Sequence, residues 1–331
     1  AEGDALSPDL LARLDETATE LARLAGVEIE NMLGKVLAVE YKGAAEEAAR
    51  LRDPVSEVDH AVELLIRARL ADRFPDHDIL GEESEERPGR ESDFVWAVDP
   101  VDGTTNFVNG FPLVAASIGV LHRHVPVAGA IWCGASHALR AGVYHACAGG
   151  TLRFDGESIE HVGNPAVRRW LAGEPEATRT EGLPWDVRKT GSAAIECAFV
   201  AAGLLRVARF ASPNVWDIAG GLPLVRATGG TILERGAGGW TEFGRFEAVR
   251  HSERAFADLR HWRRPLWERN TFWLVPAGKH EDGTTRFAKI PKPFEPGWIF
   301  ASSAASPRIS SLRSSARNCA VVIGRKACRS K

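Results

Sequence analysis

The segment that most constrains this chain is an apolar run followed at once by two aspartates. Residues 94–98 (FVWAV) have the length and composition of a buried strand, and the sequence continues as DPVDGTTNF. Pro100 disfavours a helical conformation at Asp99, and Gly103 permits a sharp bend, so we predict a turn over residues 99–103. The fold must then bring two carboxylates together where a buried strand ends.

The chemistry of this segment favours a cation. Two carboxylates held close together repel each other unless a cation lies between them, and hard divalent cations prefer oxygen ligands, including backbone carbonyls such as that of Val101. Residues 103–106 would begin a helix, whose first N–H groups can hold a phosphate. Taken alone, DPVDG could also be an ordinary polar turn, and both interpretations remain open on this segment.

Composition indicates a soluble α/β protein. The chain has 331 residues of which 44% are hydrophobic, enough for a large core, and helical and strand patterns alternate along it. No stretch is apolar enough to span a membrane, and residues 1–30 lack the pattern of a signal peptide. Five scattered cysteines without a CxxC pair disfavour a disulfide framework. We expect a cytoplasmic protein.

Charge divides the chain into two parts. Residues 271–331 contain 11 Lys and Arg against 3 acids, whereas residues 1–270 contain 30 against 41. We predict a folded domain of two lobes over residues 1–270 and a disordered basic tail, rich in Ser, Pro and Arg, over residues 271–331. The acidic body disfavours nucleic acid as a ligand, but the tail could instead bind RNA or another anionic partner.

Periodicity places the main elements. Helices are expected over residues 8–33, 61–74, 192–205 and 216–228, and strands over residues 35–41 and 79–81. Short apolar runs from residue 114 to residue 154, broken by Gly, Pro and His pairs, predict antiparallel hairpins.

Three motifs then carry a family resemblance. GEES at residues 81–84, DPVDGTTNF at 99–107 and WDIAGG at 216–221 resemble, in order and spacing, the signatures of the inositol monophosphatase family of magnesium-dependent, lithium-sensitive phosphatases. DPVSEVD at residues 53–59 and the loop at Tyr41–Lys42–Gly43 are also similar to family segments. The resemblance covers roughly residues 8–260 and implies the layered αβαβα sandwich of the inositol monophosphatase and fructose-1,6-bisphosphatase type.

The resemblance also implies roles for individual residues. Magnesium would be held by Glu82, Asp99, the Val101 carbonyl, Asp102 and Asp217. Thr104 and Asp59 would orient the attacking water near Glu82. Glu83 would lie next to the metal ligands without binding the ions itself. The substrate would be bound by a further set, namely Asp102, Gly103, Thr104, Gly191, Ser192, Ala193, Asp217 and the loop residue Lys42.

The implied chemistry is hydrolysis of a small phosphorylated metabolite by a metal-activated water. All the proposed ligands are oxygen atoms, which favours Mg²⁺ over zinc, and no covalent nucleophile is needed.

Each of these motifs also has a simpler interpretation. GEES could be a solvated acidic loop, Asp217 a favourable acid in a helical first turn, residues 56–59 a helix cap, and Lys42 a surface lysine.

The chain departs from the family in its predicted substrate pocket. Where inositol-specific members carry a glutamate that contacts the ring hydroxyls, seven residues before Asp217, this chain has Phe210. We therefore expect a leaving group other than inositol, such as a sugar, histidinol or a nucleotide. The alternative to an enzyme is a binding or regulatory protein that keeps the fold and contacts RNA or protein.

The resemblance further implies a homodimer.

Overall fold

The computed structural model describes residues 5–32, 39–41, 54–84, 86, 88, 92–159, 170–173, 185–211, 213–236, 239–246 and 271–275. Within these ranges no helix is long and apolar enough to cross a membrane. Lys42 and residues 276–331 of the predicted tail lie outside the described residues.

Two long helices form one outer layer. In α1 (Pro8–Met32) the buried residues Leu14, Ala18, Leu21 and Ala25 recur every three or four positions, as the sequence predicts. The Ser7 hydroxyl accepts the Leu10 N–H at 3.2 Å and so caps the start of α1. The neighbouring helix α3 (Glu57–Arg73) begins four residues before the predicted start at residue 61.

A seven-stranded sheet lies behind these helices, in the order β3-β4-β5-β6-β7-β8-β9. Its strands are β3 (Asp78–Gly81), β4 (Phe94–Asp102), β5 (Ala115–His122), β6 (Val125–Cys133), β7 (Gly142–Cys147), β8 (Arg153–Phe154) and β9 (Glu157–Ser158). The pair β3–β4 is parallel, and every later pair is antiparallel. The predicted hairpins between residues 114 and 154 are therefore confirmed.

The strand β4 corrects one prediction. Residues 99–102 do not leave the sheet as a turn, because β4 continues to Asp102 and pairs with β5. Asp99 lies opposite Ser117 and Asp102 opposite Ala115, so β4 holds one extra residue over this stretch. Such a bulge accommodates Pro100, which has no N–H to give to the sheet. The turn begins only at Gly103, whose φ is +91°.

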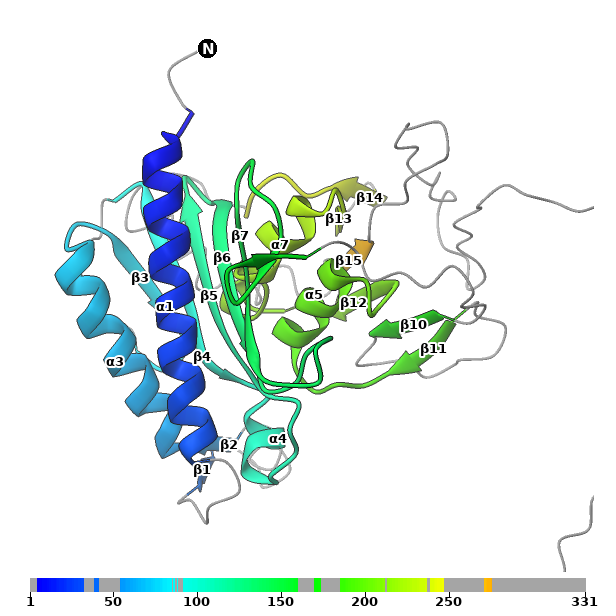
Figure 1. Ribbon diagram of the computed structural model, residues 1–331, viewed down its shortest axis with the longest axis horizontal. Coiled ribbons are helices and arrows are strands. Elements are labelled where there is room, and N and C mark those ends of the chain that lie inside the picture. Colours follow the sequence, from blue (N-terminus) through cyan, green and yellow to red (C-terminus); the bar gives the residue numbers. More distant parts are fainter. Residues whose placement is uncertain are drawn as a thin grey trace, which may run out of the picture.

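Short helices fill the space between this sheet and a second one. They are α5 (Ala193–Ala202), α6 (Val215–Ala219) and α7 (Gly221–Ala227), with α4 (Thr104–Val108) directly after β4. The helix predicted over residues 216–228 is thus two helices, α6 and α7, that meet at Gly220. In Figure 1 the layers follow one another from α3 and α1 through the first sheet and α5–α7 to the second sheet.

The second sheet has six strands in the order β11-β10-β12-β15-β13-β14. They are β10 (Trp170–Gly173), β11 (Trp185–Arg188), β12 (Val207–Ala211), β13 (Thr231–Gly236), β14 (Gly239–Glu242) and β15 (Thr271–Val275). β15 pairs antiparallel with both β12 and β13. Residues 271–275, which we assigned to the tail, therefore belong to this sheet, because they form the strand between β12 and β13.

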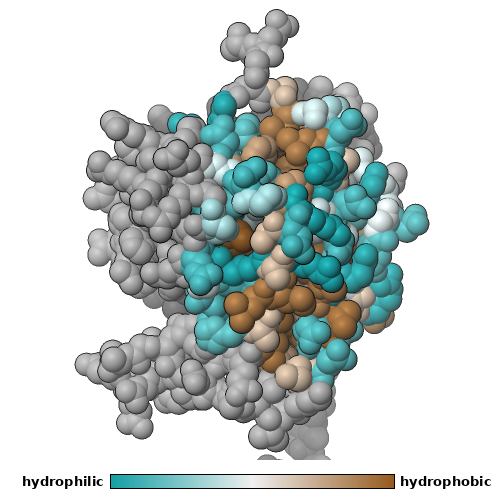
Figure 2. Space-filling view, turned by 90° about the vertical axis from the view of Figure 1, so that its left-hand side faces the viewer, coloured by the Kyte–Doolittle hydropathy of each residue, from teal (hydrophilic) through white to brown (hydrophobic). Residues whose placement is uncertain are grey.

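The remaining described strands β1 (Val39–Tyr41) and β2 (Pro54–Ser56) form an antiparallel pair just before α3. Figure 2 views the side that carries α1 and α3, where hydrophilic side chains flank a broken band of hydrophobic ones. Most apolar residues of these helices face the sheet, and Val27 and Leu64 are the large exceptions at 48% and 64% exposure. The predicted α/β class is confirmed.

Candidate active site

A cavity of about 310 Å³ lies where β4 ends and α4, α5 and α6 begin. Its lining comes from segments far apart in the sequence, namely Glu82, Asp99, Val101, Asp102, Gly103, Thr104, Gly191, Ser192, Ala193, Glu196, Phe210 and Asp217. All four acids that we predicted as metal ligands line this one space. Of the other predicted site residues, Asp59 is not part of the lining.

The bulge in β4 explains how Asp99 and Asp102 reach the same cavity. Side chains three positions apart on a regular strand point to opposite faces of the sheet. The extra residue in β4 changes this alternation, so that both carboxylates line the cavity. The convergence we predicted from a turn is thus produced by a bulge.

Asp99 is a buried acid surrounded by like charges. Its side chain is 2% exposed, and its Oδ1 atom has no hydrogen-bond partner among the described residues. Burial, and then the neighbouring charges of Glu82, Asp102, Asp217 and Asp59, raise the pKa of Asp99 well above its usual value. Asp59 on α3, itself 2% exposed, therefore lies close enough to influence the cavity electrostatically.

Asp102 is fixed by the start of α5. Its Oδ2 atom accepts the Ser192 hydroxyl at 2.7 Å and the Ala194 N–H at 2.5 Å. The same Ser192 hydroxyl accepts the Ile195 N–H at 3.1 Å and caps α5. Burial and the charge of Asp217 nevertheless raise the pKa of Asp102 to about 7, because they outweigh these hydrogen bonds.

Thr104 and Asp217 each have a local structural contact as well as a place in the cavity. The Thr104 hydroxyl donates to the Val101 carbonyl at 3.0 Å, so the pairing of Thr104 with Asp59 stays a prediction. Asp217, in the first turn of α6, accepts the Asn214 N–H at 2.6 Å. The interpretation of Asp217 as an acid in the first turn of a helix is therefore correct, and it is compatible with a role in the cavity.

Two side chains that we did not single out from the sequence lie on the segments that form the cavity. Asn106 donates from Nδ2 to the carbonyls of Leu113 and Thr190, both at 2.7 Å, and so ties α4 to the segment before α5. Glu196, 2% exposed on α5, lines the cavity and accepts the Thr190 hydroxyl at 2.8 Å. Asn106 belongs to the DGTTN stretch, which could have indicated a residue of the site. Glu196 lies in an ordinary helical pattern, which gave no such indication.

The donor atoms fit a hard divalent cation. The predicted ligands are all oxygen atoms, and the buried Asp99 Oδ1 lacks the positive partner that a desolvated carboxylate needs. Among the residues described, no three His, Cys, Asp or Glu side chains are arranged so as to hold a metal ion. The carboxylates thus share a cavity but would have to turn toward one another to coordinate a cation.

Comparison with known proteins identifies the relatives of this chain. The model of the inositol monophosphatase family matches residues 10–258. An inositol-1-monophosphatase of Synechocystis sp. is 32% identical over 246 residues, which cover 70% of this chain and 82% of that protein. The inositol-1-monophosphatase SuhB of Mycobacterium tuberculosis is 34% identical over 247 residues, covering 67% and 84%.

The chain belongs to the inositol monophosphatase family. Solved structures agree with this assignment. The IMPase of Thermotoga maritima is 25% identical, with a TM-score of 0.57, and the alignment covers 80% of this chain and 92% of that one. Mycobacterium tuberculosis SuhB is 29% identical with a TM-score of 0.52, covering 71% and 90%.

Membership in the inositol monophosphatase family establishes the reaction class and the fold. The chain is a phosphoric monoester hydrolase, its fold is the α/β sandwich of the family, and the family is generally metal-dependent. A second model, described as Large polyvalent protein associated domain 38, matches residues 258–309. It overlaps the predicted tail, of which the structure describes only β15.

Proposed function

We propose that the protein hydrolyses a small phosphomonoester with Mg²⁺ and a water molecule, in the cavity at the end of β4. The observation that carries this proposal is the meeting of carboxylates from three separate segments around one space: the end of β3, the end of β4 and the first turn of α6. Such a concentration of buried and half-buried carboxylates is unfavourable in the charged form unless cations bind there.

Glu82, Asp99, Asp102, Asp217 and the Val101 carbonyl would hold the ions. Bound Mg²⁺ would neutralise the phosphate, lower the pKa of a water and stabilise the leaving oxygen. Glu82 would position this water and help to remove its proton, because the chain directly after it is bound to α3, the helix that carries Asp59. Asp59 and Thr104 would orient the same water.

The remaining lining would bind the substrate. The backbone N–H groups of Gly103 and Thr104, at the start of α4, would hold phosphate oxygens, and Gly191, Ser192 and Ala193 would contact the leaving group. Asp102 and Asp217, which would also hold the ions, would contact the substrate as well. Lys42 stays a prediction from the resemblance alone.

Phe210 argues against inositol as the leaving group. It lies on β12, 4% exposed, and lines the cavity, where a phenyl ring cannot accept hydrogen bonds from a polyol. We propose a substrate whose leaving group packs against an aromatic ring, such as a nucleotide 3′-phosphate, histidinol phosphate or a sugar phosphate. Inositol is disfavoured because a ring hydroxyl that faces Phe210 would lose its hydrogen bonds to water without replacement, whereas a nucleobase, an imidazole or the C–H face of a sugar could pack against the phenyl ring.

A substrate panel tests the proposal. Phosphate release should be measured with Mg²⁺ for these esters and for inositol 1-phosphate, in the parent, in Asp99→Asn and in Phe210→Leu. We expect release that depends on Asp99, with inositol 1-phosphate among the poorer substrates. Clear preference of the parent for inositol 1-phosphate would reject the substrate assignment, and equal release from Asp99→Asn would reject the metal site.

We further propose a cytoplasmic homodimer, supported only by the family resemblance. Sedimentation equilibrium of the purified chain would test the assembly, and a single monomer mass at micromolar concentration would reject it.

A further inference from the structure

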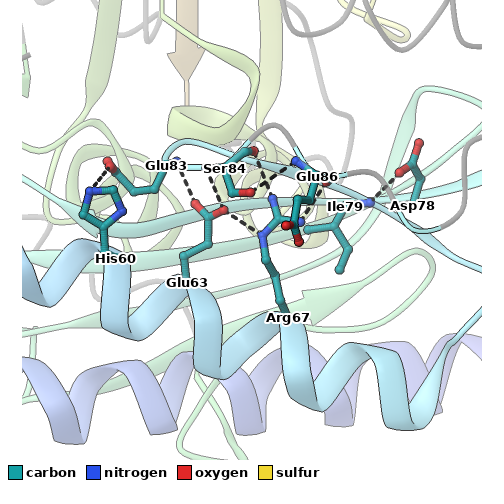
Figure 3. A network of polar contacts seen from close by, with 8 residues as sticks. All are labelled: His60, Glu63, Arg67, Asp78, Ile79, Glu83, Ser84 and Glu86. Atoms are coloured by element: carbon teal, nitrogen blue, oxygen red, sulfur yellow. Dashed lines mark hydrogen bonds and ion pairs between the residues drawn. The ribbon is translucent and has the colours of Figure 1, made fainter.

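A buried ion pair on α3 lies against the segment that follows Glu82. Glu63 and Arg67 are one helical turn apart, their side chains are 2% and 9% exposed, and Arg67 Nε lies 2.8 Å from Glu63 Oε1. Figure 3 shows both side chains pointing from α3 toward the backbone of Glu83, Ser84 and Glu86. Asp59, one turn earlier on the same helix, is buried as well.

The two side chains bind both kinds of backbone group in this segment. Glu63 accepts the N–H of Glu83 at 2.7 Å and that of Ser84 at 3.0 Å. Arg67 donates to the carbonyls of Ser84 at 3.0 Å and Glu86 at 2.9 Å. The chain after Glu82 is therefore held by four hydrogen bonds to a charged donor or acceptor, which are stronger than neutral ones.

The backbone of Glu82 is fixed on its other side by β4. Its N–H donates to the Val98 carbonyl at 3.2 Å, directly beside Asp99. Three consecutive N–H groups, from residue 82 to residue 84, thus have defined acceptors. The direction in which the Glu82 side chain leaves the backbone, relative to Asp99, follows from these bonds.

Gly81 shows how closely Glu63 approaches this segment. A Cβ atom added at Gly81 would lie 2.2 Å from Glu63 Oε1, so the carboxylate occupies the space that any other residue would need. The glycine of the GEES motif is therefore required by Glu63 and not by the cavity. The glycine and the acid form one packed unit at the end of β3.

We propose that Glu63 and Arg67 are positioning residues that hold Glu82 at the cavity. The pair is electrically balanced, so it orders the segment without adding to the negative charge of the cavity, and it acts through the backbone and not on the substrate. The role of Glu82 as a metal ligand rests on the proposed function, whereas the contacts of Glu63 with residues 83 and 84 do not.

Glu63→Gln tests this proposal. The amide keeps the size of the side chain but has one acceptor oxygen in place of two, so it cannot hold both N–H groups and Arg67 together. We expect hydrogen exchange at the amides of residues 83 and 84 to become at least about tenfold faster. Calorimetric titration with Mg²⁺ alone should give an affinity about 10- to 100-fold weaker, as for other residues that orient metal ligands.

The steady-state kinetics should separate positioning from general destabilisation. A misplaced Glu82 should lower kcat and raise the Mg²⁺ concentration for half activity, while the KM for the ester stays within about twofold. The matched control is Glu20→Gln, which breaks the exposed pair of Glu20 and Arg73, 2.5 Å apart, between α1 and the end of the same helix α3. It should leave exchange at residues 83 and 84 and the affinity for Mg²⁺ unchanged.

The outcomes are distinguishable from failure of the proposed function. Unchanged exchange at residues 83 and 84, or unchanged affinity for Mg²⁺ in a folded variant, would overturn the positioning role. If Glu63→Gln does not fold, Arg67→Lys decides by the same measurements, since a lysine cannot span the two carbonyls. A parent protein that releases no phosphate from any ester would refute the proposed function, and amide exchange would still decide about Glu63.

Discussion

Glu63 and Asp99 are two acids buried to the same extent, 1% and 2% exposed, yet their surroundings are opposite. Glu63 lies against the Arg67 guanidinium and accepts two backbone N–H groups. Asp99 has an oxygen with no hydrogen-bond partner among the described residues and lies near four other acids. One carboxylate is fully compensated by the chain, and the other is not.

Under the proposed function, the difference separates a structural charge from a functional one. Burying a carboxylate is tolerated when the protein itself supplies positive charge and hydrogen bonds, as it does for Glu63. The charged form of Asp99 keeps an unfavourable position that a bound proton or an external cation would compensate, and under the proposed function that cation is the metal ion. The ion pair that orders the backbone is thus on α3, whereas the negative charge at the end of β4 is not balanced by the chain.

Replacing Asp99 should have the largest effect. We expect Asp99→Asn to lower kcat/KM by about 10³-fold, or roughly 4 kcal/mol, because a charged ligand is lost from the reacting centre. Without metal the same variant should be more stable than the parent, since one repelling charge is removed. Phosphate release and urea unfolding in EDTA measure the two effects.

Asp78→Asn is the matched control for that comparison. Asp78 is a buried acid on the neighbouring strand β3, where it accepts the Ile79 N–H at 2.9 Å and does not line the cavity. Its replacement should lower stability and leave kcat within about twofold. A loss of activity equal to that of Asp99→Asn would contradict the distinction between structural and functional acids.

Breaking the compensated pair should reduce stability by the next largest amount. Arg67→Met leaves the Glu63 carboxylate buried without its cation, and we expect a loss of about 3 kcal/mol in the free energy of unfolding. The double variant Glu63→Gln/Arg67→Met removes both charges and should lose clearly less than the two single changes added together. Urea unfolding of all four proteins measures the coupling, and simple additivity would show that the pair is not a unit.

Adding Mg²⁺ should stabilise the parent through the carboxylates of the cavity. At a concentration one hundred times the dissociation constant, the gain is about 2.7 kcal/mol, which corresponds to a rise in Tm of roughly 5 to 10 °C. The rise should disappear in Asp99→Asn and persist in Glu20→Gln. Thermal melting with Mg²⁺ and with EDTA measures it, and an equal rise in Asp99→Asn would place the ion elsewhere.

The sequence predicted much of the cavity because its motifs are local. Asp99, Asp102 and Gly103 lie in one short stretch, and the helix after them begins at Thr104 as expected. The bulge could not be foreseen, since it depends on the pairing of β4 with β5 and not on residues 99–103 themselves.

The compensating residues were harder to predict. Glu63 and Arg67 follow an i, i+4 spacing that on most helices indicates a solvent-exposed pair. Only the packing of α3 against the end of β3 shows that they bind the backbone after Glu82. Likewise, β15 joins the second sheet through pairing with β12 and β13, whereas local composition placed it in a basic tail.

His77 offers the smallest test, because here burial acts on a group that can lose its charge. Its ring stacks between Phe74 and Phe94, each with a centroid distance of 4.6 Å, and its Nδ1 accepts the Trp96 indole N–H at 3.0 Å. Burial is the main cause that lowers the pKa of His77 from 6.5 to about 4; the charge of Asp76 opposes this shift, and Arg13 adds to it. The neutral ring is the form that the fold stabilises.

The sign of the pH effect follows from this lowered pKa. Between pH 6.5 and 4 the unfolded chain binds a proton at His77 that the folded chain does not, so stability is full above pH 6.5 and falls on acidification. Because the ring is partly exposed, we expect a loss below about 1 kcal/mol. His77→Asn keeps an acceptor for Trp96 and cannot titrate, so urea unfolding between pH 4 and 7 should show a weaker dependence on pH. An unchanged dependence would mean that His77 does not govern the acid sensitivity of the fold.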